Sequence, residues 1–294
     1  MKKDLCFGGL ALGREYRFYT RELAIDLEYF APDVPLVVFT DVPEEFADHR
    51  NVIAIKHAQR SVIRCFHDIR FVLDHALEEF KTCIAINTNV RIVEPLPMDF
   101  AKALKPGIVA LACEKLENHL RYELDDPAAW QRKSVVGVDR QVELVKLACQ
   151  KLGVSLSETD YVFEIIYAVS CEGEQKKKFI DTWGKLANFF EYHGMTWGEG
   201  FAAGIAAKVA GLPVCQNVFI PEPSYYKHRD YIDWERKGRV QNQRLTICHR
   251  QRLLLQSYAR FTLFPRAVHA RLDKLRTLLR FAWFKLTTKK GDLI

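Results

Sequence analysis

The first 114 residues alternate between short apolar runs and longer segments whose apolar side chains recur every three or four positions. Runs of the first kind are typical of buried strands, and the longer pattern is typical of amphipathic helices. The pattern predicts strands at residues 4–12, 35–41, 51–57, 82–86 and 107–114, and helices at residues 14–30 and 64–80. Alternation at this spacing indicates an α/β fold, with a mostly parallel sheet covered by helices.

The second half of the chain adds one strand and three helices to this pattern. An apolar run at residues 161–170 predicts a further strand of the same sheet. Helical spacing of apolar residues predicts helices at residues 140–153, 174–194 and 197–214. The polar and aromatic segment 225–238 is expected to form a loop over the open end of the sheet.

Charge divides the chain into two unequal parts. Residues 236–290 contain 15 Lys or Arg and a single acidic residue, Asp273, so this segment carries +14 although the whole chain carries +6. The rest of the chain is therefore acidic. This change in charge along the sequence predicts an acidic α/β domain over residues 1–235 and a basic helical tail over residues 236–294.

The basic tail repeats leucines and aromatic residues at helical spacing, and Pro265 divides it. A basic amphipathic helix of this kind is typical of segments that bind an anionic membrane surface. One alternative is a helical pair packed on the domain with a solvated charged face. Another is nucleic-acid binding, which the leucine periodicity and the lack of a nucleic-acid motif disfavour, so no nucleic-acid partner is expected.

The compartment is predicted from the cysteines and from the lengths of the apolar runs. Eight cysteines are scattered without CxxC spacing, which is typical of reduced thiols and indicates neither zinc binding nor a disulfide framework. No apolar run reaches the about 18 residues that a spanning helix requires. We therefore expect a cytoplasmic protein, peripheral at the inner face of the membrane.

The strand at residues 82–86 ends in the polar triplet Asn87-Thr88-Asn89. Ligands of α/β proteins collect at the carboxyl ends of strands, so this triplet lies in a favoured position. Amide oxygens bind Mn²⁺ or Mg²⁺ more weakly than carboxylates do, whereas amide N–H groups can donate to a phosphate. A plain asparagine turn that ends the strand is the structural alternative.

The order of these parts resembles that of GT-A type nucleotide-sugar glycosyltransferases, which have a Rossmann-like fold. The resemblance covers about residues 5–215 and is closest to glycosyltransferase family 6, which includes the blood-group A and B transferases. That family carries a diphosphate-binding Asp-x-Asp motif after its fourth strand, and some bacterial members carry Asn-x-Asn, which Asn87-Thr88-Asn89 matches. Residues 9–30 resemble its nucleoside-wrapping strand and helix, and residues 195–211 resemble its late helix that begins with glutamate.

The resemblance implies a donor site built from the first half of the chain. Residues expected to meet the nucleoside or the diphosphate are Gly9, Ala11, Gly13, Tyr16, Asp41, Arg64, Asp68, Arg70, Asn87 and Asn89. Arginine suits a diphosphate, and Arg70, oriented by Asp68, matches the family's basic position better than Arg64 does. The structural alternatives are exposed helical arginines and, for the glycines, tight packing.

The resemblance also implies a catalytic role for Glu199, which lies between Gly198 and Gly200 at a predicted helix start. It would face the anomeric carbon of the donor sugar, as a nucleophile or as a stabilising charge, and would give retention of configuration. Trp197 and Gly198 would line the sugar or acceptor site. A helix N-terminal acid and a core tryptophan are the structural alternatives.

His228, with Asp230, is a candidate to close over the diphosphate, and a plain surface loop is the alternative. Together these assignments predict a hexosyltransferase that moves a sugar from a UDP-linked donor to a glycan or lipid-linked glycan. No cofactor is expected, with Mn²⁺ or Mg²⁺ at the triplet as the alternative. A nucleotide-sugar-binding protein that has lost activity is the competing function.

Overall fold

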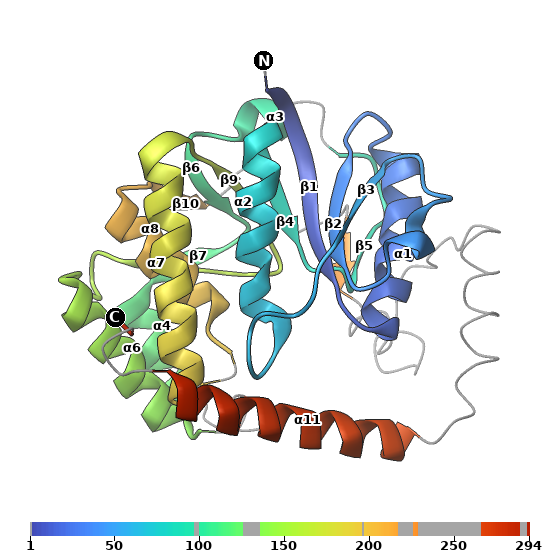
Figure 1. Cartoon of the computed structure of the whole chain (residues 1–294). Coiled ribbons are helices and arrows are strands. Elements are labelled where there is room, and N and C mark those ends of the chain that lie inside the picture. Colours follow the sequence, from blue (N-terminus) through green and yellow to red (C-terminus); the bar gives the residue numbers. More distant parts are fainter. Residues whose placement is uncertain are drawn as a thin grey trace.

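The computed structural model describes residues 2–96, 100–125, 136–195, 197–216, 226–228, 266–288 and 293–294. Within these residues, seven strands form a central sheet with helices on both faces (Figure 1). Its strands are β1 (Lys3–Ala11), β2 (Leu36–Thr40), β3 (Val52–Lys56), β4 (Phe80–Ile86), β6 (Gly107–Ala110), β9 (Ile166–Ser170) and β10 (Val214–Gln216).

The strand order is β10-β6-β9-β4-β1-β2-β3. Strands β3, β2, β1 and β4 run parallel, as do β6 and β10, whereas β9 is antiparallel to both β4 and β6. The chain passes from β1 to β2 on one side and later returns to β4 on the other. The order therefore reverses between β1 and β4, which is where open α/β sheets bind ligands.

Helices occupy both faces because successive strand residues point to opposite sides. In β2, Leu36 and Val38 join the core beneath α1, while Val37 and Phe39 join the core beneath α2, α7 and α8. The helices are α1 (Arg14–Phe30), α2 (Ile69–Glu79), α3 (Phe100–Ala103), α4 (Leu116–Asp125), α6 (Val138–Leu152), α7 (Gly173–Tyr192), α8 (Glu199–Ala210) and α11 (Arg266–Thr287). Two 3-10 turns, η1 (Pro43–Phe46) and η2 (Cys65–Asp68), complete the helical elements of the described residues.

Two small sheets correct the sequence-based assignment of strands. The run at residues 161–170 forms two strands, β8 (Asp160–Val162) and β9, because the chain turns at residues 163–165. Strand β8 pairs with β7 (Cys113–Lys115), which was expected to continue β6. Strand β5 (Val90–Ile92) pairs with β11 (Tyr226–His228), inside the segment predicted to be a loop.

The helix predicted at residues 64–80 is shorter than expected. It begins as the 3-10 turn η2, and regular α-helix starts only at Ile69. Arg64 precedes both elements in extended conformation, so it does not lie on the helix with Arg70.

The basic tail is described only in part. Helix α11 follows Pro265 and packs against α7, where Phe284 makes an edge-to-face contact with Tyr192 at 6.3 Å between ring centroids. The predicted boundary at residue 235 lies outside the described residues, as do Asp230 and Pro265. No helix in the described part of the chain is both long and apolar enough to cross a membrane.

Candidate functional site

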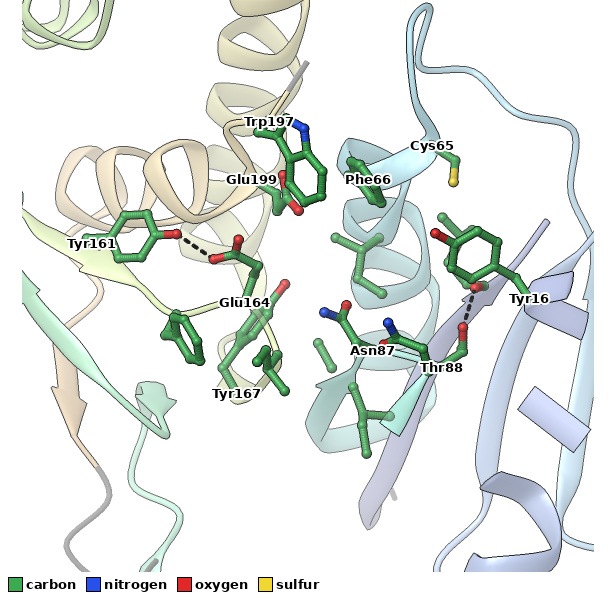
Figure 2. Close-up of a pocket in the computed structure, with 17 residues that line it drawn as sticks. Tyr16, Cys65, Phe66, Asn87, Thr88, Tyr161, Glu164, Tyr167, Trp197 and Glu199 are labelled. Atoms are coloured by element: carbon green, nitrogen blue, oxygen red, sulfur yellow. Dashed lines mark hydrogen bonds between the residues drawn. The ribbon is translucent and has the colours of Figure 1, made fainter. Parts of the chain in front are cut away.

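A cavity of about 330 Å³ opens at the carboxyl ends of β1 and β4, where the strand order reverses (Figure 2). Its walls carry aromatic side chains and a small set of polar groups, which is typical of ligand sites. The lining residues are Leu10, Tyr16, Cys65, Phe66, Ile69, Ala85, Ile86, Asn87, Thr88, Asn89, Tyr161, Phe163, Glu164, Ile165, Tyr167, Trp197 and Glu199.

The triplet after β4 forms a tight turn at the floor of the cavity. The Val90 amide donates to the Asn87 carbonyl at 3.0 Å, and the Asn87 amide donates to the Ile165 carbonyl at 2.9 Å. Both asparagines are half-buried and line the cavity, and within the described residues neither side-chain amide has a hydrogen-bond partner. Their donors are therefore available to a ligand.

Thr88, between the two asparagines, fixes this turn against β1. Its hydroxyl donates to the Leu10 carbonyl at 3.2 Å. A Cβ added to Gly9 would lie 2.9 Å from the Thr88 methyl, so glycine at this position lets the turn approach the strand. Close packing against the triplet therefore accounts for the glycine at position 9.

Glu199 is the first residue of α8 and projects into the cavity from the opposite wall. The helix lies directly against β8, because Gly200 and Gly204 present no side chain to that strand. A Cβ on Gly200 would lie 2.5 Å from the Val162 carbonyl oxygen, and one on Gly204 would lie 1.7 Å from that of Asp160. The small-residue pattern seen in the sequence thus places the catalytic candidate beside the β8–β9 turn.

Glu164, in the turn between β8 and β9, is a second carboxylate of the cavity. Tyr161 donates to its Oε2 at 2.6 Å, and burial raises the pKa of this phenol well above its usual value. Figure 2 shows Glu164 and Glu199 on one side of the cavity, with Asn87 facing them. The sequence analysis missed Glu164, although a charged residue inside an apolar run was the available signal.

The environment of Glu199 favours its neutral form. Burial, which has the largest effect, and the charge of Glu164 together raise the pKa of Glu199 to about 8, although the Gly198 amide, which donates to Oε2 at 3.1 Å, opposes the shift. A carboxyl group whose pKa lies near neutral pH can hold or release a proton during a reaction. Two nearby carboxylates that cannot both ionise freely are a recurrent feature of acid–base sites.

Arg64 is exposed beside the cavity and supplies positive charge to it. Its guanidinium carbon lies 5.6 Å from the ring centroid of Trp197 and 5.8 Å from that of Phe66, and the two rings contact each other at 4.8 Å. Its charge favours ionisation of Glu199 and Tyr16. Arg64, Trp197 and Phe66 therefore form a rim that combines an apolar surface with a cation.

Arg70 lies in the protein interior, away from the cavity lining. Its guanidinium is 4.1 Å from the Phe71 ring centroid and donates to the His67 carbonyl at 2.7 Å. Asp68 does not bond to Arg70 as expected, but accepts from the Arg60 and Ser61 amides and from the Ser61 hydroxyl, and lies 3.0 Å from His57 Nε2. The buried Asp68 instead holds the segment that leads to Arg64.

The other nucleoside candidates lie near one end of α1. Tyr16 lines the cavity, where burial and the neighbouring Cys65 raise its pKa. Asp41 does not line it: its carboxylate accepts from Arg17 at 2.7 Å and from the Gly13 amide at 3.2 Å. Gly13 adopts a φ of +82° as the N-cap of α1, which favours glycine.

Ala11 is buried in β1, and its carbonyl accepts from the Thr40 hydroxyl at 2.9 Å. Gly198 packs against Met195, and a Cβ on Gly198 would lie 3.1 Å from the Met195 methyl.

Cys65, which lines the cavity, has a thiol whose pKa burial raises to about 12, so this thiol keeps its proton at neutral pH.

His228 is placed only by its backbone, which pairs with Val90 in β5 next to the triplet. Among the described residues there is no group of three His, Cys, Asp or Glu side chains that could hold a metal ion.

A comparison of the chain with protein-family models and with curated protein sequences finds no match.

Proposed function

We propose that this chain is a GT-A type glycosyltransferase that moves a hexose from a nucleotide donor, most simply a UDP-sugar, to a hydroxyl group of a glycan or lipid-linked glycan. The observation that carries the proposal is the shared cavity of Glu199 and the Asn87-Thr88-Asn89 turn, located at the reversal of the strand order. The turn supplies donors for an anion, and Glu199 supplies a carboxyl group on the opposite wall.

The two asparagines would donate hydrogen bonds to the diphosphate, and Arg64 would contribute the positive charge. Amides add no negative charge of their own, so they can contact phosphate oxygens without a bridging cation. Arg64 is exposed and forms no salt bridge with another described residue, so its guanidinium can turn towards the phosphates. This division of roles makes donor binding independent of metal.

The aromatic side chains of the cavity would bind the nucleoside and the apolar face of the sugar. Tyr16 lies on the wall formed by α1, and Trp197 with Phe66 lies next to Glu199 (Figure 2). Stacking on such rings orients a planar base or a sugar ring. The reacting anomeric carbon would then lie near the Glu199 carboxylate.

In the proposed reaction the bond between the anomeric carbon and the diphosphate oxygen breaks, and the nucleoside diphosphate leaves with that electron pair. Ionised Glu199 stabilises the electron-deficient carbon or bonds to it, and the acceptor oxygen then forms the new glycosidic bond. The acceptor hydroxyl loses its proton, for which Glu164 is the nearby base. Two successive displacements retain configuration at the anomeric carbon.

A donor screen tests this proposal. Thermal unfolding of the full chain would be followed with UDP-, GDP-, CMP- and dTDP-sugars in the presence of EDTA, because a bound ligand raises the apparent stability by mass action. Donors that raise the unfolding temperature would then be assayed for hydrolysis and for transfer to glycan acceptors. We expect one class of nucleotide sugar to bind and to turn over in EDTA.

Two results would contradict the proposal. If no nucleotide sugar changes the unfolding temperature, the cavity is not a donor site. If a donor binds but is neither hydrolysed nor transferred, with or without Mn²⁺, the chain is a nucleotide-sugar-binding protein without transferase activity.

A further inference from the structure

Helix α11 has two different sides in the part that the structure describes in detail. Three half-buried residues, Thr277, Phe281 and Phe284, face the body of the protein. Five large apolar side chains are more than half exposed, and we call these the outer stripe: Leu275, Leu278, Leu279, Trp283 and Leu286. Their exposed fractions run from 54% at Leu275 to 86% at Leu286.

The outer stripe is continuous along the helix. At 3.6 residues per turn its five positions fall within an arc of roughly 140°, which is centred roughly opposite the half-buried positions. An apolar stripe of this width normally faces a core or another apolar phase. Because α7 occupies the other side, the stripe is directed away from the protein.

Positive charge borders the stripe. Arg276 and Lys285 occupy positions at its two edges, and the Lys285 Nζ lies 4.8 Å from the Phe281 ring centroid. Residues 266–288 contain six Lys or Arg against one acid, Asp273. A surface with exposed leucines, one tryptophan and flanking cations is complementary to a bilayer of acidic phospholipids, where the cations meet headgroups and the apolar side chains enter the acyl boundary. A neutral apolar protein surface would explain the stripe but not its basic border.

We infer that the outer stripe of α11 docks this protein on an anionic phospholipid bilayer, with the helix axis parallel to the membrane plane. The inference goes beyond the proposed chemistry and does not depend on it. The sequence predicted membrane binding or packing on the domain as alternatives, and in this inference one helix has both roles on opposite sides.

The contacts of α11 connect the docked surface to the cavity. Arg280 donates to the carbonyls of Gln59 and Ser61 at 3.0 and 3.1 Å. That segment continues directly to Cys65 and Phe66, which line the cavity. Figure 1 shows α11 along the edge of the molecule at which β1 ends, the same edge that carries the cavity. Docking would therefore hold this edge near the bilayer, within reach of acceptors carried on lipid.

Vesicle binding of the full chain tests the inference. Sedimentation with vesicles of mixed phosphatidylglycerol and phosphatidylcholine should retain the protein, whereas vesicles of phosphatidylcholine alone should not. The double variant Leu279→Ser/Leu286→Ser should lower the partition coefficient at least about tenfold, because both side chains would otherwise leave water. Trp283 emission should shift to shorter wavelength on binding, and the shift should disappear in Trp283→Phe.

Leu124→Ser is the matched control, because Leu124 on α4 is also an exposed leucine, at 42%, but lies outside the stripe. It should bind vesicles as the wild type does, and the unfolding temperatures of all variants should stay close together. The inference is overturned if acidic vesicles do not bind the protein, or if the double variant binds them unchanged. It is also overturned if the double variant abolishes a dimer in solution or an oligonucleotide complex instead.

Discussion

At the scale of single residues, the site depends on one buried carboxyl group whose ionisation costs free energy. Glu199 has only 7% of its surface exposed and shares its wall of the cavity with Glu164. Burial and the charge of Glu164 favour the neutral form, whereas a positive charge at the donor's anomeric carbon would favour the ionised form. This conflict is typical of functional positions, where stability is lower than the fold alone would allow.

Replacing Glu199 by glutamine should therefore stabilise the protein at alkaline pH. The pKa of Glu199 in the folded chain, about 8, lies above its unfolded value of 4.5, so the folded state binds more protons between these values. The stability contributed by the neutral carboxyl is complete below the unfolded pKa and is lost as the pH rises through the folded pKa. Urea unfolding of wild type and Glu199→Gln at about pH 5 and about pH 9 measures this difference.

We expect the difference in the free energy of unfolding to shift in favour of Glu199→Gln at the higher pH. Other acids with raised pKa values, such as Glu191, are present in both proteins and cancel in the comparison. A difference that does not change with pH would show that Glu199 already ionises freely in the folded chain.

The two asparagines of the turn give a second residue-scale prediction. In the double variant Asn87→Asp/Asn89→Asp, two carboxylates would face the diphosphate and repel it. Titration calorimetry in EDTA should show that the variant binds the donor at least about tenfold more weakly than the wild type does. When Mn²⁺ replaces EDTA, the affinity of the variant for the donor should be restored, since paired carboxylates bind this cation well.

Asn188→Asp is the matched control, because Asn188 is exposed on α7 and does not line the cavity. This variant should bind the donor as the wild type does. If the wild type itself requires Mn²⁺, or if the double variant binds the donor equally well in EDTA, the asparagines do not contact the diphosphate as proposed.

At the scale of elements, the position of Glu199 depends on the contact between α8 and β8. That contact is close because Gly200 and Gly204 lie on one face of the helix, four residues apart. The same strand leads into the turn that carries Glu164, so one contact fixes both acids. Any side chain at this contact should separate the helix from the strand.

Gly204→Ala should lower both stability and activity. The new Cβ would lie 1.7 Å from the Asp160 carbonyl oxygen, and backbone at that distance has to move. We expect a loss of about 3 kcal/mol in the free energy of unfolding, measured with urea. Gly137→Ala is the control, since its φ is −65° and its Cβ would meet no described residue within 4 Å. A Gly204→Ala protein as stable and active as the wild type would contradict the packing argument.

The elements also show what the sequence could and could not predict. The first strands and helices follow from local periodicity, and α1 begins at the predicted residue, Arg14. Strand β9 and the turn before it could not be distinguished within one apolar run, so Glu164 was missed. Arg70 was assigned to the diphosphate because it matches the basic position of the family that the sequence resembles, but its contacts with Phe71 and His67 bury it. Burial of a charged side chain depends on tertiary contacts that local spacing does not contain.

At the scale of the whole molecule, the site joins distant parts of the chain at one edge of the sheet. Residues near positions 10, 65, 87, 164 and 199 line a single cavity. The sequence placed the asparagine turn, Tyr16, Trp197 and Glu199 in a common site, and the structure brings these residues together. Helix α11 lies along the same edge, and the side that packs against α7 could not be read from its periodicity alone.

In the proposed mechanism, this cavity transfers a sugar by means of the Glu199 carboxylate. The most direct measurement compares donor affinity and transfer rate in wild type, Glu199→Gln and Glu123→Gln. Glu123 is also a buried acid, with its pKa raised to about 7, but does not line the cavity. We predict that Glu199→Gln binds the donor nearly as tightly as the wild type while its transfer rate falls at least about a hundredfold, and that Glu123→Gln stays active. Near-wild-type transfer by Glu199→Gln would contradict this mechanism.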